Sequence, residues 1–61
     1  MVQYYLCEFE YGYEGQFYQV IENNTLVGYV DLNNNPIILE GDYGCRIINL
    51  NPVIPSWLKN N

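Results

Sequence analysis

Glu8 and Glu10 are the residues of this chain whose type and spacing come nearest to catalytic chemistry. They alternate along a predicted strand, so both carboxylates lie on one face, roughly 7 Å apart. Two carboxylates near that separation are the acid and base of many glycoside hydrolases. A chain of 61 residues, however, has little room for a substrate cleft. We therefore expect these acids to be solvated charges that protect a sheet edge from aggregation.

Other reactive groups are scarce. The chain has no histidine, and its only arginine, lysine, serine and threonine are Arg46, Lys59, Ser56 and Thr25. Catalysis usually needs a base, a nucleophile or a cation that is held in position. This composition therefore predicts a protein that is not an enzyme and has no catalytic residue.

A calcium-like pattern occurs once. Asp31, Asn33 and Asn35 have the spacing of the oxygen ligands that open a calcium-binding loop. Pro36 stands where such a loop needs glycine, and Asp42 stands where it needs a bidentate glutamate. The flanking segments also have the pattern of strands rather than helices. We therefore predict an asparagine-rich hairpin turn, with no metal and no cofactor.

Cys7 and Cys45 are the only cysteines. Structural zinc usually takes four Cys or His ligands, so one chain does not supply a zinc site. In a cytoplasmic protein the default is a pair of reduced, half-buried thiols. A disulfide is the open alternative, and it requires that the strands carrying the two cysteines lie side by side.

The charge balance limits the partners of the chain. The formal net charge is −5, with two cationic residues. Two cations cannot neutralise many phosphates, so we expect no nucleic-acid partner, and anionic membranes are disfavoured for the same reason. No apolar stretch approaches the ~20 residues that span a bilayer. The first residues lack the basic region of a signal peptide, so we expect a cytoplasmic protein.

Short apolar segments separated by Gly, Asn and Pro are typical of an all-β fold. The predicted strands are residues 2–10, 16–22, 26–32, 37–40 and 45–50, with turns at 11–15, 23–25, 33–36 and 41–44. Turns this short favour antiparallel neighbours. We therefore predict that residues 1–50 are a single β domain of about five antiparallel strands, in a curled meander sheet or a small, partly open barrel. A flat sheet packed on a second copy is the alternative, and Gly28 inside the third strand predicts a bulge or the close approach of another backbone.

Residues 51–61 form a tail that is rich in proline. Its prolines favour an extended backbone, and Val53, Ile54 and Trp57 make it apolar. We predict that these three residues fold back over an open end of the sheet and plug it, because a tryptophan buries about 150–250 Å². The alternative is that residues 52–55, a PxxP segment, are a ligand for an SH3-type domain.

Seven tyrosines are the most informative positive feature of the composition. Tyr4, Tyr18 and Tyr29 fall in the phase opposite to the predicted core, and with Leu6 they would form one outward patch. Tyrosine is enriched in protein interfaces, where charge is depleted. We therefore predict a candidate interface of these four residues, with an ordinary two-sided core as the alternative. Self-association through this patch, as a homodimer, would also supplement a small core.

Two segments resemble small proteins of marine cyanobacteria and their phages. They are residues 29–37, YVDLNNNPI, and residues 47–57, IINLNPVIPSW. The chain is similar to that group in its tyrosine-rich first strand, its DLxxNP turn and its NPxxPxW close. The group has no assigned activity. The resemblance therefore implies only a compact protein that is expressed inside a host or infected bacterium.

These observations together predict a small, non-catalytic binding or assembly module. With the resemblance, they favour a phage accessory protein that contacts a host or virion protein. A purely structural homo-oligomer with no foreign partner is the first alternative, and a small-molecule sensor is the second. The mass of the protein in solution distinguishes the module from the homo-oligomer.

Overall fold

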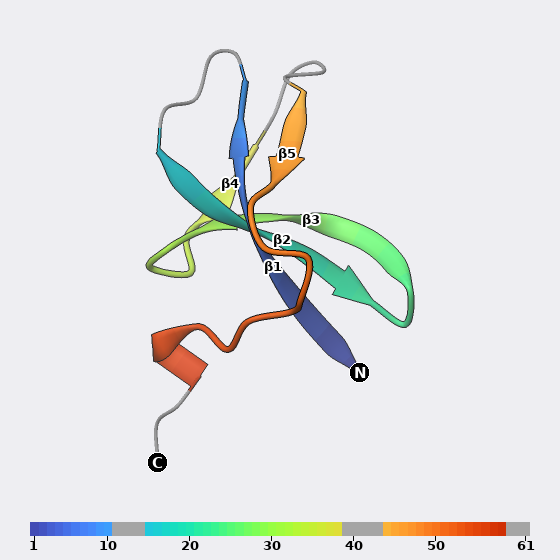
Figure 1. Ribbon diagram of the computed structural model, residues 1–61. Coiled ribbons are helices and arrows are strands. Elements are labelled where there is room, and N and C mark those ends of the chain that lie inside the picture. Colours follow the sequence, from blue (N-terminus) through green and yellow to red (C-terminus); the bar gives the residue numbers. More distant parts are fainter. Residues whose placement is uncertain (11–14, 39–43, 59–61) are drawn as a thin grey trace.

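The computed structural model describes residues 1–10, 15–38 and 44–58. Five antiparallel strands form one open sheet in the order β4-β3-β2-β1-β5 (Figure 1). The strands are β1 (Val2–Phe9), β2 (Gln16–Glu22), β3 (Thr25–Asp31), β4 (Pro36–Ile37) and β5 (Cys45–Ile47), and one turn of 3-10 helix, η1 (Ser56–Leu58), follows. The predicted fold class, a small all-β sheet of five antiparallel strands, is confirmed.

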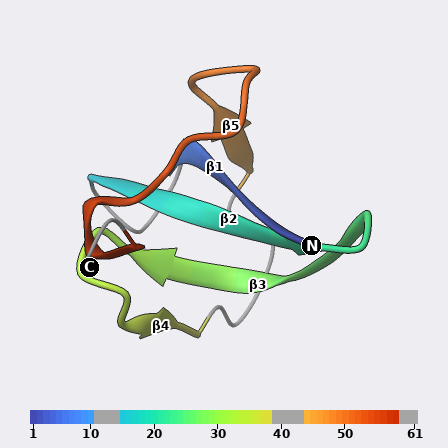
Figure 2. The same cartoon turned by 90° about the horizontal axis from the view of Figure 1, so that it is seen from below.

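The first four strands follow one another as a meander, but β5 does not lie beside β4. It pairs with β1 at the opposite side of the sheet, where Cys7 faces Ile47 and Phe9 faces Cys45 (Figure 2). β2 covers only one edge of the eight-residue β1. Pairing with β5 satisfies backbone groups along the second edge. The simplest sequential strand order therefore holds for β1 to β4 only.

The core lies on one face of this sheet. Cys7, Phe9 and Phe17 are buried, and the rings of Phe9 and Phe17 stack with their centroids 3.8 Å apart. The partly buried side chains that pack against them are Tyr29, Ile37, Cys45 and Ile47. Cys7 and Phe9 are alternate residues of β1, so both point to this face.

Asparagines form the tight turn between β2 and β3. Asn23 and Asn24 have φ angles of 52° and 67°, the left-handed region that a two-residue hairpin of type I′ requires at both positions. Asparagine tolerates this region better than other residues with a side chain. The Asn23 amide also donates to the carbonyl of Met1, at 3.1 Å. The predicted turn is confirmed, and it ends one residue before the predicted 23–25.

β3 contains the bulge that Gly28 predicts. Val20 pairs with Gly28, but the next residue, Ile21, pairs with Leu26, so Val27 is the extra residue. The bulge reverses the side-chain phase along the strand. Tyr29 consequently lies on the core face, with its ring centroid 5.5 Å from that of Phe17. The prediction that Tyr29 points away from the core is therefore wrong.

Asp31 organises the turn between β3 and β4. One of its carboxylate oxygens, Oδ1, accepts hydrogen bonds from the backbone amides of Asn33 and Asn35, at 2.8 and 2.9 Å. The other, Oδ2, accepts a bond from the side-chain amide of Asn35, at 3.2 Å. Both oxygens are thus used by the turn, and the prediction of an asparagine-rich hairpin turn is confirmed. The hydrogen bond from the backbone amide of Asn35 is the largest of the effects that lower the pKa of Asp31.

Replacing Asp31 with alanine will destabilise the protein at neutral pH, because three hydrogen bonds in the turn are lost. A lowered pKa stabilises the fold above the ordinary aspartate value of about 3.9, and this contribution disappears as the pH falls through the folded-state pKa. Urea unfolding of both proteins should therefore show a gap at pH 7 that narrows below pH ~4. Asn33→Ala keeps its backbone donor and is the control. A gap of constant size across this range would contradict the role of the carboxylate.

Several predicted boundaries differ from the structure or lie beyond it. β4 is shorter than the predicted 37–40, whose last two residues lie outside the described ranges, and β5 ends at Ile47 rather than at residue 50. Most of the predicted turns at 11–15 and 41–44, and residues 59–61 of the tail, are outside them as well. Within the described ranges, no helix is long and apolar enough to cross a membrane.

Candidate functional site

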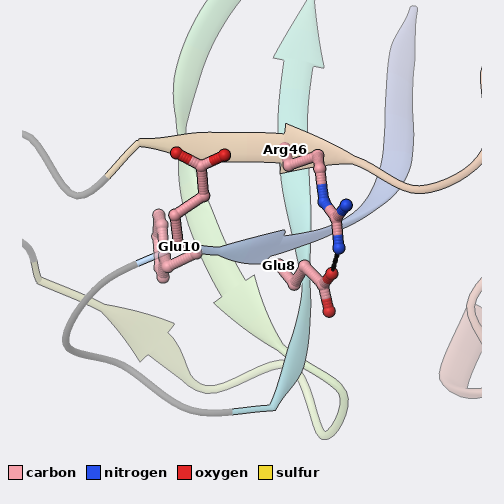
Figure 3. Close-up of a pocket in the computed structure, with 4 residues that line it drawn as sticks. Glu8, Glu10 and Arg46 are labelled. Atoms are coloured by element: carbon pink, nitrogen blue, oxygen red, sulfur yellow. Dashed lines mark hydrogen bonds and ion pairs between the residues drawn. The ribbon is translucent and has the colours of Figure 1, made fainter.

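The two acidic residues Glu8 and Glu10 lie beside β5. Glu8 faces Arg46 across the β1–β5 pair, and the two side chains form an ion pair (Figure 3). Glu10 lies just beyond the end of β1, where its backbone amide donates to the carbonyl of Gly44, at 3.1 Å. With Phe9, these charged side chains line an open hollow of about 480 Å³.

This hollow is a weak candidate for catalysis. Arg46 already occupies the carboxylate of Glu8, and its guanidinium is 65% exposed. The hydrogen bond and the charge of Glu8, with a smaller effect of Glu10, raise the pKa of Arg46. An exposed ion pair of this kind contributes little to stability. The arrangement resembles a charged sheet edge more than a site that binds a substrate between two free carboxylates.

The tail lies on the other face of the sheet from the core. The Val53 amide donates to the carbonyl of Tyr4 at 2.8 Å, which extends the outer edge of β1 beyond β5. η1 then places Trp57 edge-on against two tyrosines, with ring centroids 5.3 Å from Tyr4 and 6.3 Å from Tyr18. Pro55 is fully buried beside this aromatic cluster of Tyr4, Tyr18 and Trp57. The tail therefore covers a face of the sheet rather than an open end.

The three residues of the predicted plug have different environments. Val53 is half-buried and Trp57 packs in the aromatic cluster, whereas the side chain of Ile54 is 71% exposed. The fully buried residue is Pro55, which the sequence analysis did not single out. Proline interrupts helices and strands, so it does not take part in the apolar periodicity from which a buried position can be predicted.

The four residues of the predicted interface do not form one patch. Tyr4 and Tyr18 share a face with Leu6, because Leu6 pairs with Tyr18 and the two tyrosine rings are 6.2 Å apart. Tyr29 lies on the opposite face, against Phe9 and Phe17. Trp57 also covers part of the face that carries Tyr4 and Tyr18. A single outward surface made of all four residues is therefore not present.

A different apolar surface lies at the edge of β3. β4 pairs only with Tyr29 and Val30, so within the described part of the chain residues 25–28 have no strand partner on that side. An open groove of about 340 Å³ borders this edge, and its lining is apolar apart from the backbone and the tyrosine hydroxyl. The lining residues are Val20, Val27, Gly28, Tyr29, Val30, Pro36 and Ile37.

The side chains beside this groove are unusually exposed for their type. Leu26 is 48% exposed and Val27 is 55% exposed, although both belong to β3. The segment 25–28 carries no charge and no proline, which are the residues that usually protect a strand edge. We call this segment and the adjoining groove the β3 edge. The sequence alone predicts a longer fourth strand, residues 37–40, whereas β4 ends at Ile37.

Comparison with models of protein families, with curated proteins and with solved structures finds no match for this chain. The geometry of the described residues is therefore the basis for the functional argument that follows.

Proposed function

We propose that the protein is a small, non-catalytic binding module, and that a partner protein adds a β-strand to the β3 edge. The observation that carries this proposal is the uncharged outer edge of residues 25–28, which has no strand partner among the described residues and lies beside an apolar groove. Strand addition is a common mode of peptide recognition, in which the main chain supplies affinity and alternate side chains fill pockets.

Charge suggests what the partner strand looks like. Glu22 pairs with Thr25 at one end of the β3 edge, and Asp31 ends β3 at the other. The chain as a whole carries a net charge of −5. A partner segment that is apolar in the middle and basic at its ends complements this pattern. The partner that we propose is a host or virion protein with such a segment.

Replacing Val27 with lysine will abolish binding, because a lysine on a strand edge blocks a further strand. A pull-down from a bacterial lysate with immobilised protein should lose its bound partner in this variant. Leu50→Lys is the matched control, because Leu50 is 86% exposed and lies away from β3. Equal recovery of the partner with both variants would exclude the β3 edge as the binding surface.

A second candidate function is a homo-oligomer that serves only a structural role. It is favoured by the lack of charge in residues 25–28, since two copies can pair there without like charges facing each other in the ladder. A second copy would also cover Leu26 and Val27, and it would enlarge the core of a chain in which few side chains are buried.

Salt distinguishes the two candidates. Two chains that each carry −5 repel one another, so added salt will strengthen a homodimer, whereas it will weaken a complex with a basic partner. Sedimentation of the pure protein from about 20 to 500 mM NaCl measures the homodimer. The Debye length falls from about 20 Å to a few Å across that range. A monomer at all salt concentrations would remove the structural homo-oligomer.

A further inference from the structure

The fold brings the two cysteines of the chain together from distant parts of the sequence. Cys7 faces Ile47 and Phe9 faces Cys45, so Cys45 is the diagonal neighbour of Cys7 in the β1–β5 pair. Both side chains lie on the core face, since Cys45 packs against the cluster that contains Cys7. One condition for a disulfide, that the strands carrying the two cysteines lie side by side, is therefore met.

Neither thiol is part of a disulfide. Cys7 donates a hydrogen bond to the carbonyl of Phe17, at 3.6 Å between Sγ and oxygen. Burial raises the pKa of the Cys7 thiol, and the neighbouring Cys45 side chain raises it further. Cys45 packs against the core cluster that contains Cys7, so it belongs to the surroundings of the buried thiol.

The Cys7 and Cys45 thiols differ in their exposure to solvent. Cys7 is completely buried, whereas Cys45 is only half-buried, on a three-residue strand at the edge of the sheet. A thiol reacts with a small oxidant according to its exposure and its thiolate content. Cys45 is consequently the thiol that an oxidant reaches, and Cys7 is the protected thiol behind it.

We propose that Cys7 and Cys45 form a reversible redox pair, in which a peroxide oxidises Cys45 and Cys7 then closes an intramolecular disulfide between β1 and β5. In the first step the Cys45 sulfur attacks hydrogen peroxide, becomes a sulfenic acid and releases water. In the second step the Cys7 sulfur displaces hydroxide from that sulfenic acid, and its own proton leaves as part of a second water molecule. Two thiols are oxidised and one peroxide is reduced.

The geometry makes the second step the slow one. Diagonal neighbours in a sheet have Cα atoms about 7–8 Å apart, whereas a disulfide usually joins Cα atoms less than about 6.8 Å apart. β5 must therefore slide toward Cys7 by roughly an ångström. A strand of three residues at the edge of the sheet has few bonds that resist such a shift. The protonated state of Cys7 slows the same step, so its rate should rise with pH.

The disulfide would tie β5, and with it Arg46, covalently to β1 until it is reduced. β5 is joined to the sheet by only one neighbouring strand. A covalent link between distant residues restricts the unfolded chain, and this is how many small domains gain stability. The oxidised protein should therefore unfold at a higher urea concentration than the reduced protein.

The test is oxidation of the folded full chain with hydrogen peroxide, followed by intact-mass measurement under denaturing conditions. We expect a loss of about 2 Da, two thiols that no longer react with an alkylating reagent, and recovery of both with dithiothreitol. Cys7→Ala should instead stop at a sulfenic acid that dimedone captures. Cys45→Ala should leave Cys7 unreactive until urea is added.

The outcomes that overturn the proposal are equally direct. A gain of about 16 or 32 Da on Cys45 without any internal disulfide would show that Cys7 does not resolve the sulfenic acid. Disulfide-linked dimers as the sole product would show that the pairing occurs between chains. Since Cys7→Ala removes a buried side chain, circular dichroism of both variants checks that they remain folded, and Cys45→Ala carries the test if Cys7→Ala does not. Neither outcome depends on the proposed strand-binding function.

Discussion

Replacing Phe17 with alanine will lower the free energy of unfolding by about 3–5 kcal/mol, the usual cost of deleting a buried aromatic ring. Phe17 is fully buried and its ring stacks on Phe9 and meets Tyr29 edge-on. A domain of this size has only about 3–5 kcal/mol of stability from a single core. The variant should therefore be largely unfolded at 25 °C, as far-UV circular dichroism and urea titration would show.

Two further variants make this result specific to the core. Phe17→Leu keeps an apolar side chain and should lose much less, about 1–2 kcal/mol. Leu50→Ala removes a side chain of which 86% is exposed and should change the stability by less than about 0.5 kcal/mol. A Phe17→Ala protein as stable as Leu50→Ala would mean that the cluster of Cys7, Phe9 and Phe17 is not the main core.

The strands themselves were predictable because each carries its own local signal. Gln16–Glu22 was predicted to the residue, since Gly15 before it and Asn23 and Asn24 after it bound the segment. The core positions Cys7 and Phe9 follow from alternation with a period of two. These features depend on residues that are neighbours in the sequence, so the sequence alone contains them.

The position of Tyr29 was not predictable in this way. Before the bulge, Leu26 faces the core side together with Ile21, and after the bulge Tyr29 does so together with Gln19. A bulge places two residues opposite one, so a phase that is counted from Leu26 gives the wrong face for Tyr29. Gly28 indicates that a bulge is present, but the residue at which the register shifts depends on the partner strand.

The contacts of β5 and of the tail depend on strand order, which no local pattern specifies. The pairing of Glu8 with Arg46, and the diagonal placement of Cys7 and Cys45, exist only because β5 returns to β1. A sequential arrangement next to β4 would have separated both pairs by the width of the sheet. The same return directs the tail along β1 and onto the face that carries Tyr4 and Tyr18.

Replacing Trp57 with alanine tests whether that tail is part of the fold. Trp57 contacts Tyr4 and Tyr18, and it is held by η1 and by the bond of Val53 to Tyr4. We expect a loss of about 3 kcal/mol, because the change removes a large aromatic contact and uncovers both tyrosines. The loss should be visible as a lower urea midpoint and as greater exposure of tyrosine to solvent.

Trp57→Phe keeps an aromatic ring at the same position but removes the indole N–H. Among the buried side-chain nitrogen and oxygen atoms of the described residues, Nε1 of Trp57 has no hydrogen-bond partner. An unsatisfied buried donor costs about 1–3 kcal/mol, so phenylalanine loses some contact area but also removes this penalty. Its stability should lie within about 1 kcal/mol of the original protein, far above that of Trp57→Ala. Equal losses in the two variants would contradict this expectation, because they would mean that the smaller phenylalanine ring does not replace the contacts of the indole. Ile54→Ala, on an exposed residue of the same segment, should change nothing and serves as the control.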